Sequence, residues 1–96
     1  MLLPKVKFLF FSTLQDLTKT NRIEIDTDGN VNAALDKIFE IYGDVFKNRI
    51  IDQNSGNIKQ YIIVAVNRKD IRHLNGLETE LNDNDEISIL PAAAGG

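Results

Sequence analysis

Residues 30–43 read Asn30-Val31-Asn32-Ala33-Ala34-Leu35-Asp36-Lys37-Ile38-Phe39-Glu40-Ile41-Tyr42-Gly43, and they carry the strongest structural signal of the chain. Apolar side chains recur here every three or four positions, which is typical of one face of an amphipathic helix. Asn30 can cap the start of that helix by accepting from a free backbone N–H. Gly43 suits the left-handed position just past its end. The stretch therefore predicts one long helix near the middle of the chain.

Two β-prone runs precede this helix. In residues 5–11, Val6, Phe8 and Phe10 share one face at the period of a strand, and Leu9 and Phe11 fall on the other face. Residues 22–26 alternate between polar and apolar side chains and predict a second, half-exposed strand. The mostly polar residues 12–19 between them are expected to form a connection.

Further β-prone runs follow the helix. Residues 60–67 are apolar on both faces and predict a strand, with Ile62 on one face and Ile63 on the other. Residues 71–74 predict a short strand, and residues 86–90 predict the last strand. The turn before it contains Asn84, which can take a positive φ in place of glycine. Residues 44–51 are expected to form a further short helix. The aromatic side chains predicted to be core are Phe8, Phe10, Phe39 and Phe46.

The order of two strands, one helix and two or three strands predicts a two-layer α+β domain, because one helix covers only one face of a sheet. This is the layout of the β-grasp fold of ubiquitin: a mixed sheet of four to five strands with one main helix on one face. We expect residues 1–90 to form this domain and residues 91–96 to form a flexible tail.

The other face of the predicted sheet has no helix to cover it. Leu9, Phe11, Ile63 and Leu90 alternate out of step with the presumed core residues of the same strands. A connected apolar patch on a protein surface usually has a binding use. We therefore expect these four side chains to contact partner proteins, with Phe11 and Leu90 the most exposed.

Composition excludes several classes of function. A net charge of −3 without a basic stripe argues against a nucleic-acid partner. No apolar run approaches the length of a membrane helix, so no membrane association is expected. The chain has no cysteine, which rules out a disulfide framework, a thiolate zinc site and a cysteine nucleophile. The lack of a signal peptide and of cysteine fits a cytoplasmic location.

Few side chains look catalytic or metal-binding. Asp83, Asp85 and Glu86 lie together, but turn chemistry explains most of this cluster, and a calcium loop needs many more ligands at fixed spacing. His73 has no second histidine or cysteine to work with. We therefore expect no metal site and no bound cofactor.

The last residues, Pro91-Ala92-Ala93-Ala94-Gly95-Gly96, carry no large side chain. An ordinary chain end explains this, because most termini are poorly ordered. A second explanation is a thin substrate for chemistry at the terminal carboxylate, because glycine lets the backbone approach a nucleotide phosphate closely. Pro91 has no N–H to donate, and it is expected to stop the sheet pairing and free this tail.

The second half of the chain resembles the MoaD/ThiS family of small ubiquitin-like sulfur carriers. The resemblance rests on the motifs in residues 66–71, 76–81 and 83–91 and on the Ala94-Gly95-Gly96 ending. Asn84 stands where most members have glycine, and asparagine is a common substitute at positive φ. The extra length in residues 44–57 is similar to that of archaeal MoaD-like proteins, some of which also modify other proteins.

The resemblance implies a non-catalytic carrier that acts through Gly96. A ubiquitin-activating-type adenylyltransferase would use ATP to adenylate the Gly96 carboxylate, and a sulfur donor would convert it to a thiocarboxylate. Gly95, Ala94 and Pro91 would belong to the tail that threads the enzyme's channel. In the molybdopterin branch, the carrier is the small subunit of molybdopterin synthase, and its tail enters the large subunit.

Three alternatives remain open. Gly96 could be joined to lysines of target proteins, as in a ubiquitin-like modifier. The sulfur could instead serve tRNA thiolation or another sulfur pathway. The chain could also be a plain β-grasp interaction domain whose two terminal glycines are incidental.

Overall fold

The computed structural model of this chain describes residues 3–11, 13–27 and 29–91. Five strands and three helices follow one another as β1 (Lys5–Phe10), α1 (Thr13–Thr18), β2 (Arg22–Asp26), α2 (Val31–Tyr42), α3 (Asp44–Ile50), β3 (Ile62–Val66), β4 (Lys69–Asp70) and β5 (Glu86–Pro91). Two short 3₁₀ helices, Ile71–His73 and Gly76–Glu78, lie between β4 and β5. Within these ranges no helix is long and apolar enough to span a bilayer.

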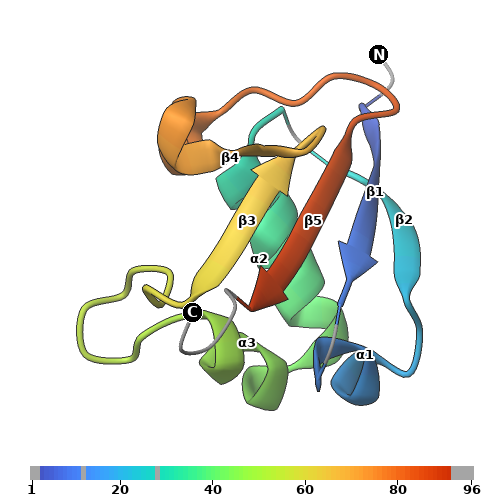
Figure 1. Cartoon of the computed structure of the whole chain (residues 1–96). Helices are drawn as coiled ribbons and strands as arrows, with labels where there is room; N and C mark the ends of the chain where they lie inside the picture. The colour runs from blue at the N-terminus through green and yellow to red at the C-terminus, as the bar shows by residue number, and fades with distance from the viewer. Residues whose placement is uncertain (1–2, 12, 28, 92–96) are drawn as a thin grey trace.

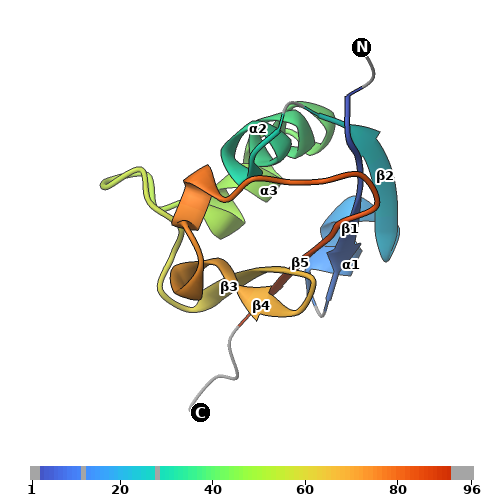
Figure 2. The same cartoon turned by 90° about the horizontal axis from the view of Figure 1, so that it is seen from above.

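The strands form one mixed sheet in the order β2-β1-β5-β3-β4. β1 pairs with β5 in parallel, and the other neighbouring strands pair antiparallel. Figure 1 shows the sheet in front of α2, and Figure 2 shows α2 and α3 on the same side of it. The predicted two-layer α+β arrangement, with one main helix on one face of the sheet, is therefore confirmed.

The core lies between the sheet and the helices. Phe8 and Phe10 of β1 are fully buried, as are Ile87 and Ile89 of β5. Phe10 meets the ring of Phe46 edge-on, with 5.6 Å between the ring centroids. The predicted core aromatics are confirmed, although Phe39 is only partly buried.

Both predicted ends of α2 are confirmed. The Asn30 side chain accepts a hydrogen bond of 2.8 Å from the Ala33 N–H. At the other end, the Gly43 N–H donates to the Phe39 carbonyl at 2.8 Å. Gly43 has φ 86° and ψ −173°, a backbone region that is essentially restricted to glycine. This conformation lets α3 begin directly after α2 and turn Phe46 into the core.

The expected open connection after β1 is wrong in part, because residues 13–18 form helix α1. Leu14 and Thr18 are buried and lie one helical turn apart. The Thr18 hydroxyl donates to the Thr20 carbonyl at 2.6 Å, which closes the end of this short helix. Two buried side chains at helical spacing thus outweigh the polar composition of the segment.

The strand predicted at residues 71–74 is also wrong. Asn67 and Arg68 take positive φ values of 51° and 73°. This tight turn places the short strand β4 at Lys69–Asp70 instead. The Asp70 carboxylate then accepts from the Arg72 N–H at 2.9 Å and caps a 3₁₀ helix at Ile71–His73.

Candidate functional site

The turn before β5 is built from backbone and side-chain hydrogen bonds to β1. Asn84 has φ 72°, as its position in the turn predicts. Its N–H donates to the Lys5 carbonyl at 2.7 Å. The Lys5 N–H donates in return to the Asp83 carboxylate at 2.9 Å. The turn therefore holds the start of β5 beside the start of β1.

A second set of hydrogen bonds joins this turn to the loop after β3. The Asp85 carboxylate accepts from the Asn67 side-chain amide at 2.9 Å and from the Asn82 N–H at 2.8 Å. The Asn67 side-chain oxygen accepts from the Glu86 N–H at 3.0 Å. These carboxylates are thus used by the fold. Across the part of the chain that the structure describes, no group of three or more acidic or histidine side chains is arranged to hold a metal.

β5 extends one residue further than predicted, because Pro91 is its last residue and lies opposite Ile62 of β3. Pairs along an antiparallel ladder are alternately hydrogen-bonded and not hydrogen-bonded. The Asn67 N–H donates to the Glu86 carbonyl, so the alternation places the Ile62–Pro91 pair at a non-hydrogen-bonded position. The missing N–H of Pro91 therefore removes no hydrogen bond from the pairing of β5 with β3. The described pairing of β5 thus ends at Pro91, one residue beyond the predicted end of the strand at Leu90.

The four predicted contact residues lie on the face of the sheet that the helices leave open. Val6, Phe8 and Phe10 belong to the buried core, so the alternating residue Leu9 points the other way. Phe11 follows the end of β1 and lines the same surface depression as Leu9. Phe11 is 41% exposed. Leu9, Ile63 and Leu90 are half-buried, so the expectation that Leu90 is among the most exposed of the four is wrong. We call Leu9, Phe11, Ile63 and Leu90 the open-face patch.

The register of the strands brings the open-face patch to the end of the sheet at which β5 ends. Ile63 lies directly opposite Leu90. Leu9 lies one row further back, opposite Ser88. Tyr61, just before β3, is 57% exposed at this same end. The apolar surface is therefore next to the point from which residues 92–96 continue.

One side of the patch forms a shallow depression of about 520 Å³ beside α1. It is lined by Leu9, Phe10, Phe11, Gln15, Asn21 and Arg22. The sequence did not indicate Gln15 as a surface contact, because residues 12–19 were expected to form a connection. It did not indicate Arg22 either, because the neighbours of a strand residue depend on the strand register. The register of β1 and β2, which pairs Leu9 with Arg22, is the signal that places Arg22 there.

The rest of the open face is charged. Lys7 lies between Glu24 of β2 and Glu86 of β5 in the strand register. Near β4, the Arg72 guanidinium donates three hydrogen bonds to the Asp70 carboxylate, at 3.2, 3.1 and 2.6 Å. These hydrogen bonds from Arg72 lower the pKa of the Asp70 carboxyl below its ordinary value. Opposite charges thus offset one another away from the apolar end.

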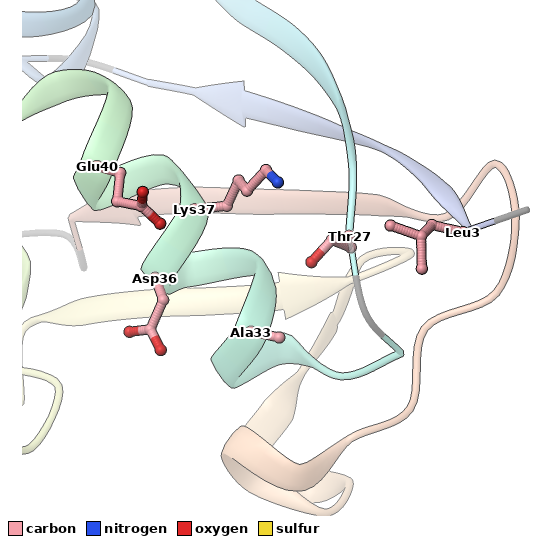
Figure 3. A pocket seen from close by; sticks show the side chains of 6 residues that line it. All are labelled: Leu3, Thr27, Ala33, Asp36, Lys37 and Glu40. Carbon is pink, nitrogen blue, oxygen red and sulfur yellow. The ribbon is translucent and has the colours of Figure 1, made fainter.

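Other surface depressions lie elsewhere on the described residues. Figure 3 shows one of about 290 Å³ between α2 and the end of β2, where the Lys37 side chain extends toward Thr27. Its lining contains Asp36 and Glu40, but no histidine or cysteine. The candidate site is the end of β5 with the open-face patch beside it.

The remaining predicted site residues, Ala94, Gly95 and Gly96, lie outside the described residues. So does the flexible tail expected beyond Pro91. Their roles stay predictions.

Comparison with known proteins tests the family resemblance. The ThiS family model matches residues 8–96, which is most of the chain. The chain belongs to the ThiS family. This assignment confirms the resemblance to the ThiS/MoaD group of ubiquitin-like sulfur carriers.

Relatives of this ThiS-family chain include modifiers and sulfur carriers. Small archaeal modifier protein 3 of Haloferax volcanii is 30% identical over 94 residues, covering 96% of this chain and 99% of that protein. Sulfur carrier protein CysO of Mycobacterium tuberculosis is 34% identical over 74 residues, covering 70% of this chain and 80% of that one. The chain is therefore similar to both functional kinds within the family.

The solved structures confirm the fold. The solution structure of small archaeal modifier protein 1 from Methanosarcina acetivorans superimposes with a TM-score of 0.86 at 30% identity, covering 98% of each chain. This ThiS-family chain therefore has the ubiquitin-like β-grasp fold over its whole described length.

Proposed function

We propose that this chain is a sulfur carrier that is activated at its C-terminal Gly96. A ubiquitin-activating-type adenylyltransferase binds the open-face patch and receives the tail in its ATP site. The observation that carries this proposal is the position of the patch, which lies at the end of the sheet where β5 passes into the tail. A partner that covers the patch is then close to the tail.

The chemistry falls on the Gly96 carboxylate. That carboxylate attacks the α-phosphorus of ATP, pyrophosphate leaves, and an acyl-adenylate forms. A donor of hydrosulfide then attacks the acyl carbon, AMP leaves, and the thiocarboxylate forms. The carrier needs no base or metal of its own for either step, because the enzyme supplies the ATP site. Gly95 keeps the tail thin at the point of closest approach to the nucleotide.

The tail and the open-face patch have different roles in this proposal: the patch binds the partner, and the tail reacts. Central apolar anchors commonly contribute about 2 kcal/mol or more to an interface. The open-face patch supplies such anchors, and the tail supplies the reacting group. CysO of Amycolatopsis orientalis, whose structure is similar to this chain at 28% identity, forms a complex with the protein BexX, which fits this division.

Two fates of the activated tail are proposed. The first is molybdopterin synthesis, in which the chain is the small subunit of molybdopterin synthase and its tail enters the large subunit. The second is modification of target proteins, in which Gly96 is joined to lysine side chains. The similarity to small archaeal modifier proteins along nearly the full length of both chains favours the second fate.

The test is reconstitution with the adenylyltransferase of the native host. We expect the chain to stimulate ATP–pyrophosphate exchange, and a variant lacking Gly95 and Gly96 to give none while folding normally. Full exchange with the truncated variant would contradict the proposal. For the fate, a tagged chain is expressed in the host. Target lysines that carry a C-terminal peptide of this chain ending in Gly96 support modification, whereas a stable complex with the molybdopterin synthase large subunit supports the first fate.

A further inference from the structure

Two cations flank the apolar end of the open face. Arg22 of β2 lies beside Leu9 and lines the same depression as Phe11. Lys59 precedes β3, and its ammonium lies 5.8 Å from the centroid of the exposed Tyr61 ring. Since β1 and β5 lie between β2 and β3 in the sheet, the two cations stand on opposite sides of the open-face patch.

Neither cation is neutralised by the fold. Across residues 3–11, 13–27 and 29–91, Arg72–Asp70 is the one ion pair within 4.0 Å. The charges of the far half of the open face alternate in register, with Lys7 between Glu24 and Glu86. The two cations beside the patch have no such neighbours at bonding distance, so their positive charge is available to a partner.

Acidic side chains gather at a different place on the described surface. The chain carries a net charge of −3. A depression near the start of α2 is lined by Asp36, Glu78 and Glu80. None of these residues belongs to the apolar patch or its two flanking cations, so the acidic depression and the cationic rim are separate sites.

We infer that Arg22 and Lys59 recognise carboxylates on the activating enzyme and orient the carrier as it binds. This inference rests on the proposed function, and it names the chemistry of the partner surface: an apolar centre with acidic residues on two sides. Complementary rim charges mainly raise the rate of association and exclude wrong partners. An acidic partner surface would also repel the acidic depression at the start of α2, which favours approach through the patch.

The experiment compares two double charge reversals. Arg22→Glu with Lys59→Glu alters the rim. Lys37→Glu with Lys47→Glu makes the same change in net charge on exposed lysines of α2 and α3. Each variant is titrated in the ATP–pyrophosphate exchange assay with the host adenylyltransferase, from about 50 to 500 mM salt, because screening weakens exposed charge pairs over this range. Thermal unfolding checks that each variant is folded. If the rim variant is not folded, the neutral double variant Arg22→Gln with Lys59→Gln is tested in its place.

At low salt we expect the rim variant to lose roughly tenfold in kcat/KM, as for two reversed surface charges. The rate at saturating carrier should be unchanged, and the loss should fade at high salt. The helical-side variant should show no comparable loss. Equal losses in both variants, a loss independent of salt, or a gain in the rim variant would overturn the inference while leaving the proposed function intact. Absence of exchange with the unaltered chain would overturn both.

Discussion

Ile63 lies directly opposite Leu90 in the β3–β5 ladder, one residue before the Ile62–Pro91 pair that ends β5. This pair makes the open-face patch continuous with the root of the tail. A partner that contacts Leu90 therefore binds one residue before Pro91. The continuous backbone of β5 connects this contact to the tail. The position of the patch along the strand, more than its apolar area, links docking to activation.

Replacing an apolar side chain of the patch by a charge should weaken binding without unfolding the domain. We expect Phe11→Asp or Leu90→Asp to reduce affinity for the activating enzyme about thirtyfold, as for loss of an apolar anchor. Phe11→Asp should leave the melting temperature nearly unchanged, because Phe11 is exposed. The control is Val45→Asp, an exposed apolar residue of α3, which should leave affinity unchanged. Titration calorimetry measures the affinity of each variant for the activating enzyme. Equal losses of affinity in all three variants would refute the assignment of the patch.

Phe10 and Phe11 are neighbours in sequence that face opposite sides of the sheet. Phe10→Ala should lower the free energy of unfolding by about 3–5 kcal/mol, because it empties a fully buried position. Phe11→Ala should cost less than about 1 kcal/mol, since its ring is partly exposed. Urea unfolding of the two variants compares them directly. Similar losses in both would mean that the sheet does not turn Phe11 away from the helices.

Gly43 is the residue at which α2 passes into α3. Gly43→Ala should destabilise the domain by about 1–3 kcal/mol, because φ 86° with ψ −173° is strained for any side chain. Steric contact is not the cause, since a Cβ there would meet no atom within 4 Å. Gly29→Ala is the control. A Cβ at Gly29 would also meet open space, but the φ of Gly29 lies outside the positive range that strains a side chain. Thermal unfolding that ranks the two variants equally would contradict the strain argument.

A larger side chain at Gly95 should block activation while leaving the fold unchanged. The expected reason is the close backbone approach to the nucleotide that glycine permits. Gly95→Val should therefore lose ATP–pyrophosphate exchange and keep its affinity for the adenylyltransferase, because the open-face patch is unaltered. Exchange at the unaltered rate would show that the channel tolerates bulk at this position.

Much of this architecture could be predicted from periodicity. The helical stripe of α2 and the alternation in β1, β3 and β5 were sufficient to separate Phe10 from Phe11 and to place the open-face patch. Turn chemistry identified Asn84, because asparagine tolerates its positive φ.

The missed features depend on contacts distant in sequence or on single turns. α1 forms because Leu14 and Thr18 are buried against other elements, which a polar segment alone does not reveal. β4 is displaced by two successive positive φ values at Asn67 and Arg68, and arginine gives no sequence signal for that conformation. Arg22 entered the candidate site through its register with Leu9, and register requires the paired strand.

The most direct test of the central claim is the intact mass of the chain after reaction with the host adenylyltransferase, ATP and a sulfur donor. We predict a species heavier by the mass difference between sulfur and oxygen, with the change confined by fragmentation to Gly96. The same mixture without ATP should give only the unaltered mass. An unaltered mass in the complete mixture, with an adenylyltransferase that is active on another carrier, would contradict the claim that Gly96 carries the sulfur.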